Sequence, residues 1–175
     1  MKHDFVEAIQ RRTARVAVGP SALRGAGHKG ALDAARQFLG DVDLRPFGTS
    51  DQLQFMIHLD EATLDLKRSL PKGARHWGLA RKALNLFFRD SLYTIYLTER
   101  YSLARAEEMF EVPLDSITGK RLSELAAGEL PRWRTIKGLT PEISSDFQRF
   151  AAEYAAKKEI ARVHLDAFWW GGREL

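Results

Sequence analysis

One segment, residues 79–97, restricts the fold of this chain more than any other, because it is apolar on most of its sides. It is long enough for about five turns of α-helix, and a helix with so little polar surface has to be covered by its neighbours. Its polar side chains Arg81, Asn85 and Arg89 form a stripe at a spacing of four residues, with Lys82 beside them. The pattern predicts a central, buried helix with one polar edge.

Helical periodicity continues through most of the remaining sequence. Pro71 ends one predicted helix, and Asp60, Asp115 and Thr140 are suitable N-caps for three others. Besides the central helix, the predicted helices span about residues 5–16, 31–39, 49–58, 61–70, 104–110, 115–128, 140–159 and 164–170. We therefore expect an all-α fold over residues 1–175, a compact bundle of about eight to ten short helices. A single domain of this length forms either one body or two lobes around a cleft.

Composition excludes several kinds of protein. The chain has no cysteine, which excludes disulfides, thiolate zinc sites and cysteine-ligated iron–sulfur clusters and predicts a cytoplasmic location. No apolar run reaches the roughly 18 residues that cross a membrane, and residues 1–12 lack the apolar core of a signal peptide. His58, His76 and His164 are scattered along the chain. We expect no metal, no cofactor, no membrane contact and a monomer.

Positive charge is concentrated in one part of the chain. Between residues 67 and 89 there are seven Lys or Arg residues and no Asp or Glu, whereas the whole chain has a net charge of only +4. Such a run has two interpretations, which the sequence leaves open. It is either a solvated basic face or a surface that contacts the phosphates of a nucleic acid.

Lys82 and Asp115 are the candidate catalytic residues. A lysine acts as a nucleophile only as the neutral amine, and the ordinary pKa of lysine is about 10.4. The start of a helix, a neighbouring cation such as Arg81, and burial each lower that pKa, and the sequence predicts Lys82 in a first helical turn. Asp115 is predicted at an N-cap, where a carboxylate stays ionised and can stabilise positive charge on a sugar. Taken singly, each residue has a simpler explanation, a surface lysine and an ordinary helix cap.

The residues around this pair resemble the helix-hairpin-helix (HhH-GPD) DNA glycosylases of base excision repair. In that family a Gly-x-Gly turn, one further residue, a catalytic lysine and an apolar helix follow one another. Gly78, Ala80 and Lys82 stand in this order here, with Ala80 in place of the second glycine. The segment Val112–Ser116 resembles the family's apolar-Pro-x-Asp segment and puts Asp115 in the place of its aspartate.

The spacing of the two motifs is closest to the archaeal 8-oxoguanine glycosylase branch of the family. Asp115 follows Lys82 by 33 positions, and the closing segment His164–Trp170 resembles a His-x-Asp segment near the C-terminus of that branch. The resemblance implies a helix-hairpin-helix over about residues 60–98.

The resemblance also implies a function. The enzyme would act on double-stranded DNA that carries a damaged base, such as an oxidised purine, after flipping the nucleotide out of the duplex. Lys82 would attack the sugar C1′ and form a Schiff base, Asp115 would assist, and β-elimination would nick the strand (AP lyase activity). The residues expected to contact DNA are Lys72, Arg75, Gly78, Arg81, Asn85 and Arg89. Those expected in the base pocket, or as a wedge in the duplex, are Trp77, Phe87, Phe88, His164, Asp166, Trp169 and Trp170.

Two other functions fit the same sequence. A non-catalytic helix-hairpin-helix module would bind DNA in a salt-sensitive way without nicking it. A helical protein-interaction domain would use the basic run only as a solvated face, and it would bind no DNA at low salt.

Overall fold

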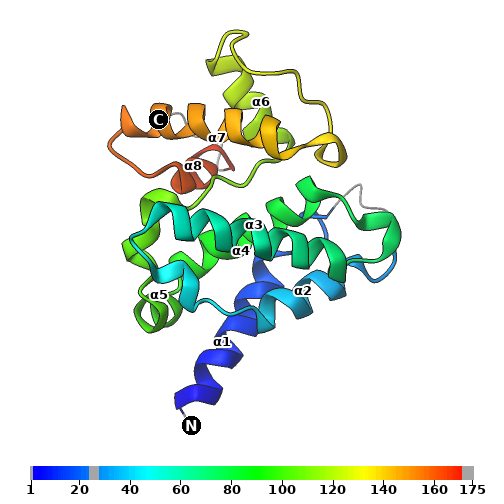
Figure 1. Cartoon of the computed structure of the whole chain (residues 1–175), viewed down its shortest axis with the longest axis vertical. Helices are drawn as coiled ribbons and strands as arrows, with labels where there is room; N and C mark the ends of the chain where they lie inside the picture. Colours follow the sequence, from blue (N-terminus) through cyan, green and yellow to red (C-terminus); the bar gives the residue numbers. More distant parts are fainter. Residues whose placement is uncertain (1, 24–27, 171–175) are drawn as a thin grey trace.

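The computed structural model describes residues 2–23 and 28–170, and these residues are helical without any strand, which confirms the all-α prediction (Figure 1). The described part of the chain contains eight α-helices joined by short 3-10 helices and loops. The α-helices are α1 (Lys2–Ala17), α2 (Ala31–Asp41), α3 (Gln52–Ser69), α4 (Trp77–Leu92), α5 (Ile95–Tyr101), α6 (Ser116–Leu125), α7 (Pro141–Ala156) and α8 (Leu165–Trp170). The 3-10 helices are η1 (Arg45–Gly48), η2 (Lys72–Ala74), η3 (Leu103–Met109), η4 (Ile136–Gly138) and η5 (Arg162–His164).

The helices form two lobes, each with its own cluster of buried side chains. Helices α1 to α5 and η3 enclose the larger cluster, which includes Phe47, Phe55 and Phe88. Helices α6, α7 and α8 enclose the smaller one, built around Phe147. In Figure 1 the smaller lobe lies at the opposite end of the molecule from α1. Of the two arrangements that the sequence allowed, the structure has the two lobes.

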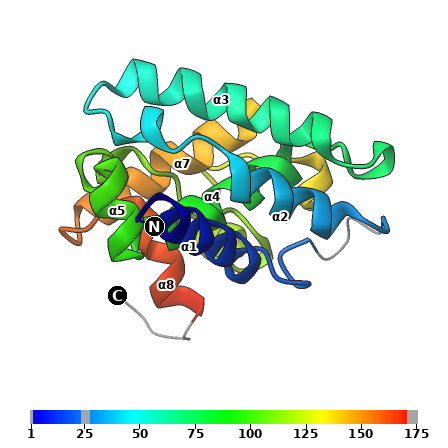
Figure 2. The ribbon, with the colours of Figure 1, turned by 90° about the horizontal axis from the view of Figure 1, so that it is seen from below.

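Helix α4 is the central helix that the apolar segment predicts. It packs against α1, α2, α3 and α5, and α1 to α3 surround it in the view of Figure 2. The predicted end at residue 97 is wrong, because α4 ends at Leu92 and α5 begins at Ile95. Two threonine hydroxyls satisfy the carbonyl groups at the break: Thr94 Oγ1 donates to Asp90 O, and Thr98 Oγ1 donates to the carbonyls of residues 91 and 92. These bonds satisfy carbonyl groups at the end of α4, where the chain turns into α5.

Helix α3 is longer than predicted. The sequence predicts two helices separated near Asp60, whereas the structure has one helix, capped by Asp51, whose carboxylate accepts from the Gln54 amide at 3.1 Å. Asp60 lies in the middle of α3 and its carboxylate accepts a hydrogen bond from Arg81 at 2.8 Å. Asp60 therefore bonds to a residue 21 positions away in the sequence instead of capping a helix. A local sequence pattern does not indicate a partner at that separation.

The predicted helix boundaries in the last third of the chain hold in part. Thr140 caps α7, accepting from the Ile143 amide, and Pro141 is the first helical residue, as predicted. Helix α7 ends at Ala156, a few residues before the predicted end. The predicted helix over 104–110 is the 3-10 helix η3.

Gly78 lies at a close contact between α4 and the segment around η4. It is buried, and a Cβ atom at this position would lie 2.6 Å from Leu139 Cβ and closer still to the carbonyl oxygen of Ile136. The prediction that Gly78 contacts DNA is wrong, because the smaller lobe covers it. Its lack of a side chain allows η4 to dock on α4.

We expect Gly78→Ala to destabilise the protein by about 1–3 kcal/mol, because the added methyl group pushes the two lobes apart. Chemical denaturation measures the change. Gly138→Ala is the matched control, since a Cβ atom there meets only Thr135 Oγ1 at 3.6 Å. An equal loss in both variants would contradict the role given to Gly78.

Candidate functional site

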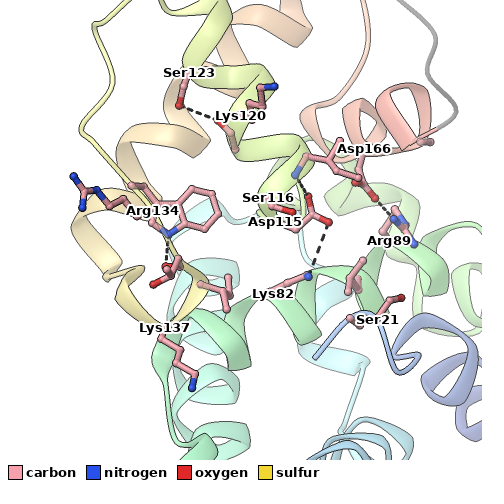
Figure 3. A pocket seen from close by; sticks show the side chains of 18 of the residues that line it. Ser21, Lys82, Arg89, Asp115, Ser116, Lys120, Ser123, Arg134, Lys137 and Asp166 are labelled. Atoms are coloured by element: carbon pink, nitrogen blue, oxygen red, sulfur yellow. Dashed lines mark hydrogen bonds and ion pairs between the residues drawn. The ribbon is translucent and has the colours of Figure 1, made fainter. Parts of the chain in front are cut away.

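A cleft of about 1440 Å³ lies between the lobes. The larger lobe contributes the end of α1, three residues of the following loop (Gly19, Ser21 and Ala22) and the face of α4 that carries Lys82, Leu86, Arg89 and Asp90. The smaller lobe contributes the first two turns of α6, Gly128, residues 130–137 and the start of α8. Figure 3 shows side chains from both lobes pointing into the same space. The cleft is therefore a site built from parts of the chain that are distant in sequence.

Lys82 and Asp115 meet in this cleft. Lys82 Nζ lies 3.9 Å from Asp115 Oδ2, and the side chains are 11% and 17% exposed (Figure 3). Lys82 comes from α4 in the larger lobe, and Asp115 stands directly before α6 in the smaller lobe. The two candidate catalytic residues are thus brought together across the gap between the lobes.

Asp115 is also a helix cap, as the sequence predicts. Its Oδ1 atom accepts hydrogen bonds from the amides of Ile117 at 2.8 Å and Thr118 at 3.0 Å. These bonds hold the carboxylate in one orientation, with Oδ2 nearest to Lys82. Asp115 can therefore cap α6 through Oδ1 and interact with the Lys82 amine through Oδ2 at the same time.

Burial lowers the pKa of Lys82, against the opposing effect of the negative charges of Asp115 and Asp166. From the sequence, the helix dipole and the charge of Arg81 are also expected to lower the pKa of Lys82. Both expectations are wrong. Helix α4 begins at Trp77, so Lys82 lies in the second turn, beyond the range of the dipole. Arg81 is engaged elsewhere, and desolvation of the amine is the cause.

Arg81 and Asn85 are not DNA contacts, because both are buried and bonded to Glu111. Arg81 donates to both carboxylate oxygens of Glu111, at 2.8 and 3.0 Å, and Asn85 Nδ2 donates to one of them at 2.8 Å. Burial alone raises the pKa of Glu111, but the charge and hydrogen bonds of Arg81 hold it below its usual range. This network ties α4 to the segment that leads into Asp115.

Asp166 and Arg89 both line the cleft. Asp166 is buried and accepts hydrogen bonds from Arg89 Nη1 and from Thr118 Oγ1, the latter at 3.2 Å. Burial raises the pKa of Asp166, and the charge of Arg89 opposes that rise. Arg89 also pairs with Asp90 at 2.7 Å. The predicted place of Asp166 in the pocket agrees with the structure, whereas Arg89 is largely neutralised by two carboxylates.

Most of the predicted pocket aromatics lie elsewhere. Phe87 and Phe88 are buried in the core of the larger lobe, so neither is a wedge. Trp77 packs on the core of the smaller lobe with the Arg81 guanidinium 5.2 Å from its ring centroid. Trp169 is buried near Tyr154. None of these four lines the cleft. Trp170 is the last residue of α8, and its side chain lies outside the described structure.

His164 supports a cleft residue that the sequence did not single out. The phenol of Tyr93 lies 2.8 Å from His164 Nδ1, and His164 Nε2 lies 2.6 Å from a carboxylate oxygen of Glu107. The Tyr93 and His164 rings are stacked at 5.6 Å. Tyr93 lines the cleft and His164 stands behind it, so His164 is not itself part of the pocket wall.

Lys72 and Arg75 are exposed in the turn between α3 and α4. Neither lines the cleft, and Arg75 Nε donates to the carbonyl of Leu70 at 2.9 Å. A role for them in contacting DNA stays a prediction.

Residues 130–137 are the largest part of the site that the sequence did not indicate. This stretch lines the cleft over its whole length and contributes Arg132, Trp133, Arg134 and Lys137. Basic residues on both sides of a tryptophan are typical of nucleic-acid contacts. That signal is present in the sequence, where Arg132, Trp133 and Arg134 follow one another.

Comparisons with protein-family models, with curated proteins and with solved structures give no match to this chain. Among residues 2–23 and 28–170, no three His, Asp or Glu side chains lie together as metal ligands do. No helix in this described part is both long and apolar enough to span a membrane.

Proposed function

We propose that the protein is a DNA glycosylase with AP lyase activity, which removes a damaged base through a Schiff base on Lys82. One observation supports this most strongly. A buried amine with a lowered pKa lies 3.9 Å from a capped carboxylate in a large cleft. A titratable group whose pKa is shifted by burial, beside a charged partner in a cleft, marks a candidate catalytic site.

The chemistry follows from these two groups. The neutral amine of Lys82 attacks C1′ of the damaged nucleotide, the N–C1′ bond forms, and the glycosidic bond breaks with its electron pair leaving on the base. The departing base takes up a proton, and Asp115 accepts the proton that the amine loses. Asp115 also stabilises the positive charge that develops on the sugar. Opening of the sugar ring, with a proton transferred to O4′, gives the Schiff base. The released base or a water molecule then takes the C2′ proton, the C2′–C3′ double bond forms, and the C3′–O bond breaks as the 3′ phosphate leaves.

The size and lining of the cleft suit a segment of a polymer. Its volume of about 1440 Å³ exceeds the range of about 300–1,000 Å³ that is usual for small-molecule pockets. Its lining contains six Lys or Arg residues against three Asp residues. A net positive cleft attracts a polyanion.

Borohydride trapping tests the proposal. The protein is incubated with a duplex that contains an abasic site, or an 8-oxoguanine, and sodium borohydride is added. The expected result is a covalent protein–DNA complex, because borohydride reduces the imine to a stable amine. Salt-sensitive DNA binding without trapping or nicking would instead indicate a non-catalytic binding module. Absence of DNA binding at low salt would favour a protein-interaction domain.

The pH dependence of trapping provides a further prediction. The single-turnover rate should rise with pH as Lys82 loses its proton, with a midpoint below the ordinary pKa of about 10.4. The Asp115 carboxylate raises the pKa of Lys82, so Asp115→Asn should move the midpoint to lower pH. The plateau rate should fall by about 10- to 100-fold, because the charge that stabilises the sugar cation is lost.

Asp90→Asn is the matched control for this profile. Asp90 lines the same cleft but pairs with Arg89 rather than Lys82. The midpoint of the pH profile of Asp90→Asn should therefore equal that of the wild-type protein. Equal midpoints in the wild-type protein and Asp115→Asn would show that the titrating group is not Lys82.

A further inference from the structure

Residues 130–137, the rim segment, form an anchored wall of the cleft. Trp133 packs its ring on Gly119 of α6, where a Cβ atom would lie 2.6 Å from Trp133 Cε3. The ring meets Phe147 edge-on at 5.6 Å, and its Nε1 atom donates to the carbonyl of Thr135 at 2.6 Å. A central tryptophan therefore fixes the rim segment to the smaller lobe.

The other end of the rim segment is fixed to the larger lobe. Ile136 begins η4, and its carbonyl lies against Gly78 in the first turn of α4. Ile136 packs on both hydrophobic clusters. The rim segment thus bridges the lobes, and its side chains have a defined position relative to Lys82.

Three basic side chains of the rim segment have no acidic partner within the described structure. Arg132, Arg134 and Lys137 are exposed, and no ion pair or hydrogen bond involves their side chains in this part of the chain. Arg134 and Lys137 extend away from the Lys82–Asp115 pair in Figure 3. Successive side chains of an extended chain alternate in direction, so Arg132 and Arg134 are expected on the side opposite Trp133.

The floor of the cleft has the opposite charge balance. There Lys82 and Arg89 face Asp90, Asp115 and Asp166, which leaves a formal excess of one negative charge. The sixth cation of the lining, Lys120, pairs with Glu124 outside the cleft. The rim segment has a formal charge of +3. The rim of the cleft is therefore positive and its floor is slightly negative. A ligand that places negative charges at the rim and a neutral group inside the cleft fits this distribution.

We propose that the rim segment binds the phosphodiester backbone of the DNA strand whose nucleotide enters the cleft. A nucleotide in DNA has this charge pattern, because its phosphates are anionic and its base and sugar are neutral. The inference rests on the proposed function for the identity of the polymer. It adds a phosphate-binding surface in the smaller lobe, separate from the turn that carries Lys72 and Arg75. Its contacts would fix the position of the strand without reading its sequence.

The salt dependence of DNA binding tests this inference. Binding of a duplex with a tetrahydrofuran abasic analogue is measured by fluorescence anisotropy over a series of salt concentrations, with Lys82→Gln as the background to prevent chemistry. Each phosphate contact contributes about 0.9 to the slope of log K against log salt. Combining Arg132→Ser, Arg134→Ser and Lys137→Ser should lower that slope by about 2.7 and weaken binding. Should this triple variant fail to fold, Arg132→Ser and Lys137→Ser singly should each lower the slope by about 0.9.

A charge-matched triple variant is the control. Arg12, Arg105 and Lys157 are exposed and do not line the cleft, so their replacement by serine removes the same net charge elsewhere. Its slope should stay close to that of the background protein. Equal slopes in the two triple variants would overturn the inference.

The inference and the proposed function can fail separately. The rim triple variant can show a smaller salt slope while the wild-type protein gives no borohydride trap. That result would support phosphate binding by the rim segment and contradict the proposed enzyme activity. A trap with no change of slope in the rim variant would contradict the rim surface alone. Absence of DNA binding at low salt would contradict both.

Discussion

Replacing Lys82 by glutamine is expected to abolish covalent trapping on DNA with an abasic site. Glutamine retains much of the length and polarity of lysine but has no nucleophilic amine, so no imine can form. The loss should be on the order of 1,000-fold or more, as for removal of other catalytic nucleophiles. Gel electrophoresis after borohydride reduction measures it. Binding of the abasic analogue should remain, since the other cleft cations are unchanged.

Lys120→Gln is the matched control for this experiment. Lys120 lines the same cleft, but its side chain is 78% exposed and its amine lies 3.7 Å from Glu124. This exposed amine pairs with Glu124 and is not the amine that we propose forms the Schiff base. Trapping should therefore persist in Lys120→Gln. Undiminished trapping in Lys82→Gln would show that another amine is the nucleophile.

Replacing Glu111 by alanine is expected to cost about 3–5 kcal/mol of folding stability, or about 6–20 °C in Tm. The Glu111 carboxylate is 5% exposed and carries the hydrogen bonds of Arg81 and Asn85. Alanine leaves the Arg81 guanidinium buried beside a cavity, with Asp60 and Thr63 as its remaining side-chain hydrogen-bond partners. Thermal and denaturant unfolding measure the loss.

Two further variants make this prediction specific. Glu153→Ala removes an exposed carboxylate from α7 and should change stability by less than about 0.5 kcal/mol. Combining Arg81→Met with Glu111→Leu removes both buried charges and should be less harmful than Glu111→Ala alone. A loss below about 1 kcal/mol in Glu111→Ala would contradict the structural role of the network.

The Glu111 contribution also has a defined pH dependence. The folded-state pKa of Glu111 is lowered, so its charged form stabilises the fold above the unfolded-state pKa, about 4.3. That contribution is lost as the pH falls through the folded-state pKa. The stability difference between the wild-type protein and Glu111→Gln should therefore shrink as the pH is lowered from about 5.

The sequence predicts the core of this fold better than its boundaries. The apolar composition around Leu84 and Phe87 requires a buried helix, and the structure has one. The end of that helix depends on Thr98, whose hydroxyl bonds back to the preceding turn across the break. Contacts of this kind are not visible in hydrophobic periodicity, because polar side chains form them after the chain has turned.

The candidate site is also predicted only in part. The order of motifs predicts that Lys82 and Asp115 belong together, and the structure places them in one cleft. The stripe of Arg81, Asn85 and Arg89 suggests a phosphate-binding edge. Two of these residues instead point to Glu111, 26 and 30 positions away. Amino-acid type and spacing predict that such residues share a face, but the partner that covers the face comes from another part of the fold.

Mapping the covalent adduct within the protein tests whether Lys82 is the nucleophile. After trapping on DNA with an abasic site, the complex is digested with nuclease and trypsin and the peptides are sequenced by mass spectrometry. An adduct on Lys82 blocks cleavage after that residue, so we expect a peptide Lys82–Arg89 that carries the sugar remnant on its first residue. A sugar remnant on Lys120, Lys137 or any other lysine, with Lys82 unmodified, would contradict the role of Lys82.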